Sequence, residues 1–151
     1  METKTGTIHL TRDGIQELIP HRDDALLIDN AAVDPETNTA TSIWTAIGVL
    51  GHYPDMPLTP GHITDEALAL LCGVLYKQCH PDTQGKPVLF SKEMRYWRPI
   101  TPGQTVTLNA KYVGLGRGGA VLIFDVKATI LVNGREKDAV IGTISACIVS
   151  A

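Results

Sequence analysis

The chain has 151 residues, of which 44% are apolar and 19% are charged, and its formal net charge is −3. This length and composition predict one globular domain, residues 1–151, with a sizeable core. The weak negative charge argues against nucleic-acid binding, which needs dense positive charge on one face. The longest uncharged run in the middle of the chain is about half the length of a membrane span, so we expect no span. Three cysteines without disulfide or zinc spacing, at positions 72, 79 and 147, predict reduced thiols and a cytoplasmic protein.

The first third of the chain predicts a short helix and a strand hairpin. Residues 11–18 form a helical pattern that Thr11 can cap and that ends before Pro20. Residues 26–33 and 39–47 are rich in residues typical of strands, and an Asp-Pro-Glu turn separates them. We expect these two strands to pair.

A second helix is predicted over residues 62–78. Apolar side chains at helical spacing form one stripe, and further apolar residues fill the other sides of the same helix. A helix that is apolar all round is buried all round. In a chain of this size, the remaining elements must wrap around it.

The second half of the chain predicts four strands. Residues 104–113 alternate apolar and polar side chains, and residues 88–98, 120–132 and 138–149 also have strand character. Asn133-Gly134 is typical of a type I′ hairpin turn between the last two strands. Long antiparallel strands around one buried helix predict an α+β fold.

The segment GHYPDMPLTPGHITDE, residues 51–66, concentrates the chemistry. Prolines stiffen a loop that carries His52 and leads to His62, and Glu66 stands on the predicted buried helix, where burial would raise the pKa of its carboxyl. Spacing alone does not choose between the two histidines as a catalytic base. Gly61 stands where the loop enters the helix, so its N–H is a candidate for polarising a substrate carbonyl.

Two other interpretations of this segment are a structural role for Glu66 and a metal site. Glu66 near a helix start is typical of a carboxylate that interacts with the helix dipole. A metal site from His62, Asp65, Glu66 and His52 is a weaker alternative, because no second ligand pair accompanies it. We therefore predict no metal.

The segment resembles the 3-hydroxyacyl-acyl-carrier-protein dehydratases of fatty-acid synthesis. Gly51-His52-Tyr53-Pro54, Pro60-Gly61 and Glu66-Ala67-Leu68-Ala69 are similar to that family's G-H-F-P, P-G and E-A-L-A motifs. Residues 18–29 and 94–104 resemble two further family segments, L-P-H-R-x-P-F-L-L-x-D and F-x-R-P-V-x-P-G-D. The resemblance covers about residues 15–113.

The resemblance implies a hotdog fold, in which a long antiparallel sheet curls around the central helix. It implies a dimer, and possible larger or mixed assemblies, in which one chain's His52 faces the other chain's Glu66. His52 would be the base and Glu66 the acid, while the Gly61 N–H would stabilise the enolate-like oxygen. The product would be a trans-2-enoyl thioester, and no cofactor beyond the carrier's phosphopantetheine arm is expected.

The same resemblance suggests which other residues meet the substrate and its carrier. We expect the substrate to contact Tyr53, Pro54, His62, Leu70 and Phe90. The basic residues Lys92, Arg95 and Arg98 are candidate contacts for the acidic acyl carrier protein, although solvated strand charges explain each of them equally well.

Several positions depart from the family pattern. Leu70 replaces a glutamine one turn after the acid, Asp23-Asp24-Ala25 replaces an aromatic and proline pattern, and His62 and Thr64-Asp65 replace apolar residues. These polar changes suggest a specialised role in polyketide or polyene synthesis. They also keep two alternatives open: a non-catalytic subunit that pairs with another hotdog chain, and a hotdog thioesterase.

Overall fold

Seven antiparallel strands form one sheet around the helix that the sequence predicts. The computed structural model describes residues 6–48 and 57–149. Within these residues the strands lie in the order β1-β2-β3-β5-β6-β7-β4. The strands are β1 (Ile8–Thr11), β2 (Asn30–Asp34), β3 (Thr39–Thr45), β4 (Lys86–Tyr96), β5 (Thr105–Gly116), β6 (Val121–Val132) and β7 (Arg135–Val149).

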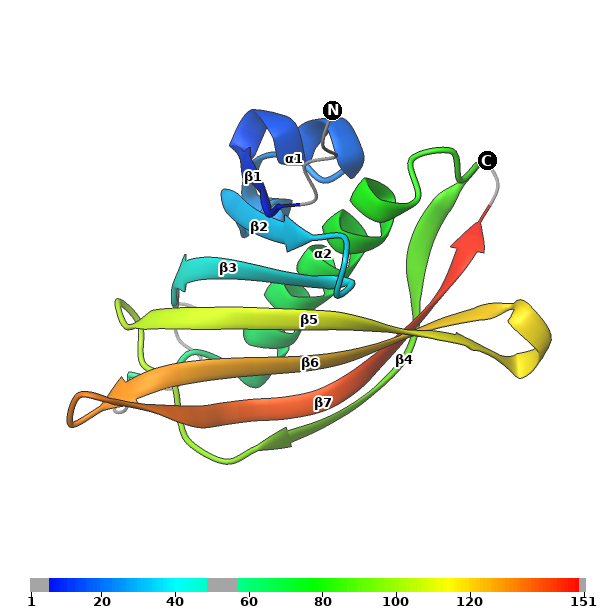
Figure 1. Ribbon diagram of the computed structural model, residues 1–151. Helices are drawn as coiled ribbons and strands as arrows, with labels where there is room; N and C mark the ends of the chain where they lie inside the picture. The colour runs from blue at the N-terminus through cyan, green and yellow to red at the C-terminus, as the bar shows by residue number, and fades with distance from the viewer. Residues whose placement is uncertain (1–5, 49–56, 150–151) are drawn as a thin grey trace.

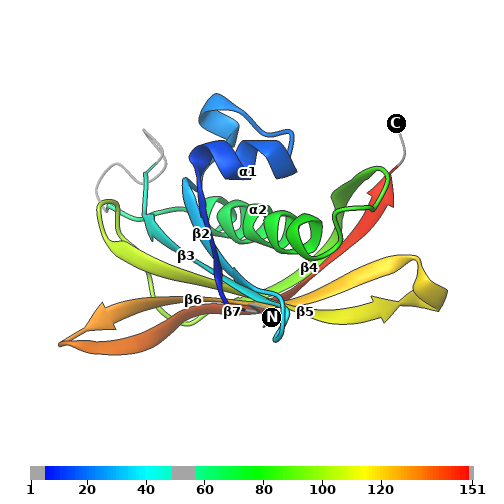
Figure 2. The ribbon, with the colours of Figure 1, turned by 45° about the horizontal axis from the view of Figure 1, so that its top comes forward.

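The predicted central helix is α2 (Gly61–Cys79), and it lies in the trough of the curved sheet (Figures 1 and 2). The short helix α1 (Arg12–Leu18) lies over α2 on the side away from the sheet (Figure 2). Two 3₁₀ turns, Asp23–Ala25 and Arg117–Gly119, complete the described elements. This arrangement confirms the α+β hotdog fold that the resemblance implies.

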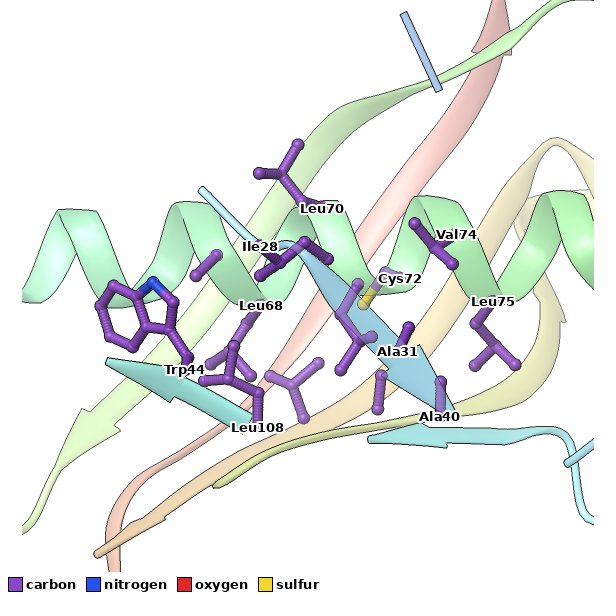
Figure 3. Close-up of a cluster of buried hydrophobic side chains, with 14 of the residues drawn as sticks. Ile28, Ala31, Ala40, Trp44, Leu68, Leu70, Cys72, Val74, Leu75 and Leu108 are labelled. Atoms are coloured by element: carbon purple, nitrogen blue, oxygen red, sulfur yellow. The ribbon is translucent and has the colours of Figure 1, made fainter. Parts of the chain in front are cut away.

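The core forms where alternating strand residues meet α2. Val106, Leu108 and Ala110 of β5 are buried, as the alternation predicts, and Leu68 and Leu75 of α2 are fully buried. Figure 3 shows Leu68 and Leu75 pointing from α2 toward the strands, whereas Leu70 points away from the sheet. Leu70 is nevertheless buried, because the chain covers this side of the helix as well.

The predicted hairpin at Asn133-Gly134 is confirmed by its backbone. Asn133 has φ 52° and Gly134 has φ 78°, and a type I′ turn requires positive φ at both central residues. The turn fixes the pairing of Val132 with Arg135 and of the two long strands that follow from it.

Three features near the N-terminus differ from the sequence prediction. Strand β1 precedes α1 and pairs with β2, although the segment has no long alternating pattern that would predict a strand. Thr11 stands at the N-cap of α1 as expected, but its hydroxyl makes no capping hydrogen bond. The predicted strand over residues 26–33 begins only at Asn30.

No helix within residues 6–48 and 57–149 has the length and apolarity that a membrane crossing requires.

Candidate functional site

Two backbone hydrogen bonds fix the start of α2. Pro60 stands at the N-cap with φ −59°, and the N–H of Ile63 donates to the Pro60 carbonyl oxygen at 3.0 Å. One residue earlier, the Thr59 N–H donates to the carbonyl oxygen of Ile100 at 2.7 Å. Proline restricts φ, and the hydrogen bond from Thr59 to Ile100, in the loop between β4 and β5, fixes the entry of the chain. Gly61 therefore begins the helix, where backbone N–H groups have no partner within the helix.

Glu66 is exposed in the single chain, so the prediction that it is buried is wrong for the isolated chain. The physical reason is the direction of its side chain on α2. His62 and Glu66 are exposed and Ala69 and Gly73 are partly exposed, and these four positions recur at helical spacing. One stripe of an otherwise buried helix is thus left open.

The open stripe borders an apolar cavity of about 320 Å³. Glu66 and Leu70 line it, one helical turn apart, and the first residues of β4 form the opposite wall. Further residues of α2, of the segment after α1 and of the sheet complete the lining: Ala69, Cys72, Gly73, Ile19, Pro20, His21, Phe124, Ile144 and Ala146. This cavity places a carboxylate at the border of an apolar volume.

His21 is a polar side chain in this cavity that spacing alone did not single out. Its Nδ1 atom is buried and has no hydrogen-bond partner among the described residues. Arg22, its neighbour in the family-like motif, donates to the carbonyl oxygens of Ile19 and His21, each at 2.8 Å. Arg22 therefore holds the bend that brings His21 to the cavity.

The buried carboxylate of the helix is Asp65, not Glu66. Asp65 is 3% exposed, and its Oδ2 atom accepts hydrogen bonds from Lys92 Nζ at 2.8 Å and from the Tyr96 hydroxyl at 2.5 Å. Both donors come from β4. Partial burial, the hydrogen bond to Asp65 and the charge of Asp65 together raise the pKa of Tyr96.

Tyr96 also packs directly on Gly61. A Cβ atom added to Gly61 would lie 2.8 Å from Cε1 and 3.1 Å from Cζ of the Tyr96 ring. Real Cβ atoms do not approach carbon so closely, so only glycine fits here without movement of the ring. Tyr96 lines a second hollow of about 320 Å³ together with Gly61, Thr64 and Arg98.

The three basic residues predicted to contact a carrier protein do not share one surface. Lys92 is engaged by Asp65, and Arg98 Nη1 donates to the carbonyl oxygen of Asp138 at 2.8 Å. Arg95 lies on the opposite face of β4, in a broad hollow on the outside of the sheet that also holds Glu93 and Lys127.

The remaining predicted residues divide between the described and undescribed parts of the chain. His52, Tyr53 and Pro54 lie outside the described residues. His62 is exposed one turn before Glu66, and Phe90 is 48% exposed at an irregularity of register in β4. Gly61, Glu66 and Leu70 all lie on α2, where Glu66 and Leu70 line the apolar cavity and Gly61 lines the hollow beside Tyr96.

The described residues also bear on the metal alternative. Asp65 is directed at β4, whereas His62 and Glu66 are exposed, so these three side chains do not converge. Within the described ranges, no group of three or more His, Cys, Asp or Glu side chains is placed to hold a metal ion.

Asp65 and Tyr96 are the site residues that sequence reasoning missed as partners. The sequence contains a signal for this partnership. Asp65 is an acid inside an apolar helical run, and Lys92 and Tyr96 are four residues apart in a predicted strand, so both lie on the same face of that strand. What the sequence did not supply was the register that brings this face of β4 against α2.

Comparison with known proteins identifies the family of the chain. A family model described as "FabA-like domain" matches residues 47–137. The chain is 32% identical over 122 residues to the 3-hydroxyacyl-acyl-carrier-protein dehydratase FabZ of Lactococcus lactis subsp. cremoris, covering 77% of this chain and 82% of that protein. It is also 32% identical to FabZ of Streptococcus pneumoniae serotype 4, covering 78% and 85%.

Solved structures share the fold at low sequence identity. Cj0977, a sigma28-regulated virulence protein from Campylobacter jejuni, aligns with a TM-score of 0.66 at 15% identity, covering 93% of this chain and 91% of that one. A hypothetical thioesterase from Streptococcus pneumoniae, solved with coenzyme A, aligns with a TM-score of 0.58 at 14% identity, covering 76% and 80%. At these identities the likeness concerns the fold alone.

The family model spans more than half of the chain, and the match to the FabZ dehydratases covers 77% of it. The residues matched include Gly61, Glu66 and the β4 segment that packs on them. The chain belongs to the FabA-like dehydratase family.

Proposed function

We propose that this chain is a hydro-lyase that converts a 3-hydroxyacyl thioester, carried on acyl carrier protein, to the trans-2-enoyl thioester. The observation that carries the proposal is the placement of Gly61 and Glu66 on the first two turns of α2, with Glu66 at the border of an apolar cavity. Dehydration needs a proton donor beside a water-poor volume, and this placement fits that need.

The chemistry uses proton transfers and no cofactor. His52 takes the proton from the carbon α to the thioester carbonyl, and the Gly61 N–H hydrogen-bonds the oxygen on which negative charge develops. The C3–O bond then breaks as Glu66 gives its proton to the leaving hydroxyl, which departs as water. The electron pair of the broken C–H bond becomes the new double bond, so atoms and charges balance.

A dimer is part of this proposal, because Glu66 is exposed in one chain and the catalytic role needs a drier setting. Strand β4 is the last strand of the sheet and is 11 residues long, and Val88, Leu89 and Phe90 on it are each 48% exposed. An edge strand with an exposed apolar segment invites pairing with another strand. A second copy, related by a two-fold axis, would cover both this edge and the neighbouring cavity.

The cavity suggests where the acyl chain lies. Its lining is mostly apolar, and Leu70 continues the apolar surface one turn beyond Glu66. The polar departure at Asp65 lines neither this cavity nor the hollow beside Gly61, because its carboxylate binds β4. Asp65 therefore gives no support to a specialised polyketide or polyene substrate, and we propose acyl chains of fatty-acid type.

An assay of carrier-bound 3-hydroxyacyl substrate tests the proposal. We expect wild-type protein to form the 2-enoyl thioester, and His52→Ala and Glu66→Gln to lower kcat/KM by at least about 100-fold, since each removes a proton-transfer group. Matched controls are His9→Ala and Glu36→Gln, which change an exposed histidine and an exposed glutamate elsewhere on the chain.

Product analysis separates the alternatives. Free acid and thiol would identify a thioesterase. An inactive pure protein that becomes active only with a second hotdog chain would identify an auxiliary subunit. Either result would overturn the proposed dehydration by this chain.

A further inference from the structure

We propose that Asp65, Tyr96 and Lys92 form a positioning network that fixes the first two turns of α2 against β4 and thereby sets the places of Gly61 and Glu66. The inference rests on the dehydration proposed above, and it adds residues that touch neither the reacting atoms nor the acyl cavity. We call these three residues the α2–β4 clamp.

The clamp joins the two elements at one atom. Lys92 and Tyr96 stand four residues apart on β4, about 13 Å along a strand, yet both donate to the same oxygen, Asp65 Oδ2. The two side chains reach Asp65 from opposite directions along the strand. Sliding α2 along β4 in either direction would stretch one of these hydrogen bonds.

The burial of Asp65 makes the loss of its hydrogen bonds costly in free energy. Asp65 is 3% exposed, while the Lys92 side chain is 37% exposed and can reach water. A buried carboxylate that loses its hydrogen-bond donors cannot be solvated by water where it lies. Separating Asp65 from Lys92 and Tyr96 is therefore unfavourable mainly because of the cost at Asp65. The Asp65 Oδ1 atom already lacks a hydrogen-bond partner among the described residues, which leaves Oδ2 to satisfy the group.

The clamp acts on both proposed catalytic groups of α2. Asp65 immediately precedes Glu66, so holding Asp65 fixes the helical rotation from which Glu66 projects. Tyr96 bonds Asp65 through its hydroxyl and packs its ring on Gly61, within 2.8 Å of where a Cβ would be. One aromatic side chain therefore relates the position of the Gly61 amide to that of the acid.

Misplacement of these groups should appear in kcat rather than KM. The Gly61 N–H and Glu66 act most strongly on charge that develops in the transition state, so a small displacement weakens interactions that the bound substrate has not yet made. Displacements of about 1 Å can lower rates by about 100-fold.

The test compares Tyr96→Phe, Asp65→Leu and the double variant with wild type. We expect each single variant to lower kcat of the folded protein by about 10-fold or more while KM changes by less than about twofold. Tyr112→Phe is the matched control. It removes a tyrosine hydroxyl near Tyr76 and His80, at the other end of α2.

The double variant Asp65→Leu/Tyr96→Phe should recover part of the lost kcat. Removing one member leaves a buried polar group without its partner, whereas replacing both with apolar groups leaves an apolar contact. A role in folding alone would lower the folded fraction and leave kcat per folded protein unchanged, so unfolding temperatures are measured for every variant.

A second readout does not depend on activity. In ¹H–¹⁵N spectra, the amide resonances of Gly61 and Glu66 should shift in Tyr96→Phe and stay in place in Tyr112→Phe. Unshifted amides together with unchanged kcat in Tyr96→Phe would overturn the clamp. Shifted amides in Tyr96→Phe, together with a wild-type protein that dehydrates no substrate, would instead overturn the proposed function and leave the clamp standing.

Discussion

Asp65 and Glu66 are consecutive on α2, and they differ by about 100° around its axis. That rotation puts Asp65 against β4, where it is buried, and leaves Glu66 exposed beside the apolar cavity. One carboxylate, that of Asp65, therefore holds α2 against β4, and the next, that of Glu66, is accessible for the proposed proton transfer. Neither residue type nor position along the helix distinguishes the two roles.

Gly61→Ala should lower kcat without preventing folding. The added Cβ would meet the Tyr96 ring at 2.8 Å, so the ring must move and its hydrogen bond to Asp65 must lengthen. We expect a fall of about 10-fold or more in kcat, measured on carrier-bound substrate, with a smaller change in KM. Full activity in this variant would show that the ring moves without disturbing the acid or the amide.

Tyr96 should make the protein less stable at alkaline pH. Its pKa is raised in the folded chain, so the unfolded chain loses the tyrosine proton first as pH rises above about 10. The free energy of unfolding should then fall as the pH rises above about 10, and it should fall less in Tyr96→Phe. Urea unfolding at a series of pH values measures the difference, and parallel curves for the two proteins would contradict it.

At the scale of elements, the periodic segments were predictable and the irregular ones were not. The alternation in β5, the Asn133-Gly134 turn and the apolar run of α2 each follow from local side-chain pattern, and all three are confirmed. Strand β1 has only four residues, and it exists because β2 pairs with it. Such a strand depends on tertiary contact that a local pattern does not contain.

The exposure of Glu66 has a similar cause. The apolar sequence around Glu66 predicts its burial, but the sequence does not say which stripe of the helix the same chain leaves uncovered. Likewise, the resemblance makes Lys92 a candidate contact for a carrier protein, and the sequence does not show that its ammonium group forms an ion pair with Asp65. The family motifs give the positions of the proposed site residues along the chain, and the packing of elements decides what each described one touches.

Gly142→Ala tests the pairing of β4 with β7. A Cβ at Gly142 would come within 3.0 Å of the backbone of Glu93 and Met94, and backbone cannot turn aside as a side chain can. We expect the free energy of unfolding to fall by about 1–3 kcal/mol, as in other overpacked sites. Chemical denaturation measures this change. Ser145→Ala, on the same strand, is the control, and an equal effect in both variants would argue against a specific clash.

At the scale of the whole molecule, one chain presents half of the proposed site. Glu66, its cavity and the exposed edge of β4 are contiguous, because the first residues of β4 line the cavity. Coverage by a second chain would bury the acid and the edge together. In the proposed dimer, assembly would therefore determine the surroundings of the proposed acid, Glu66.

Mixing two inactive variants tests this shared site. In a mixed dimer of His52→Ala and Glu66→Gln chains, one of the two sites pairs an intact His52 with an intact Glu66 from the other chain. Random reassociation makes half of the dimers mixed, so about one quarter of wild-type activity should return. Activity is measured after unfolding and refolding the two variants together. No recovery, with dimers confirmed by sedimentation, would place both groups of a site on one chain.

The adjacency of Asp65 and Glu66 has a consequence for comparing sequences. A single misplaced gap in this segment would exchange the exposed acid for the buried one, and both would still read as a carboxylate on the same helix. The two are separated by their surroundings: Asp65 has two donors on β4, and Glu66 faces the cavity. In distant relatives, an acid here is therefore assigned correctly by the strand residues opposite it, at positions 92 and 96, rather than by its letter alone.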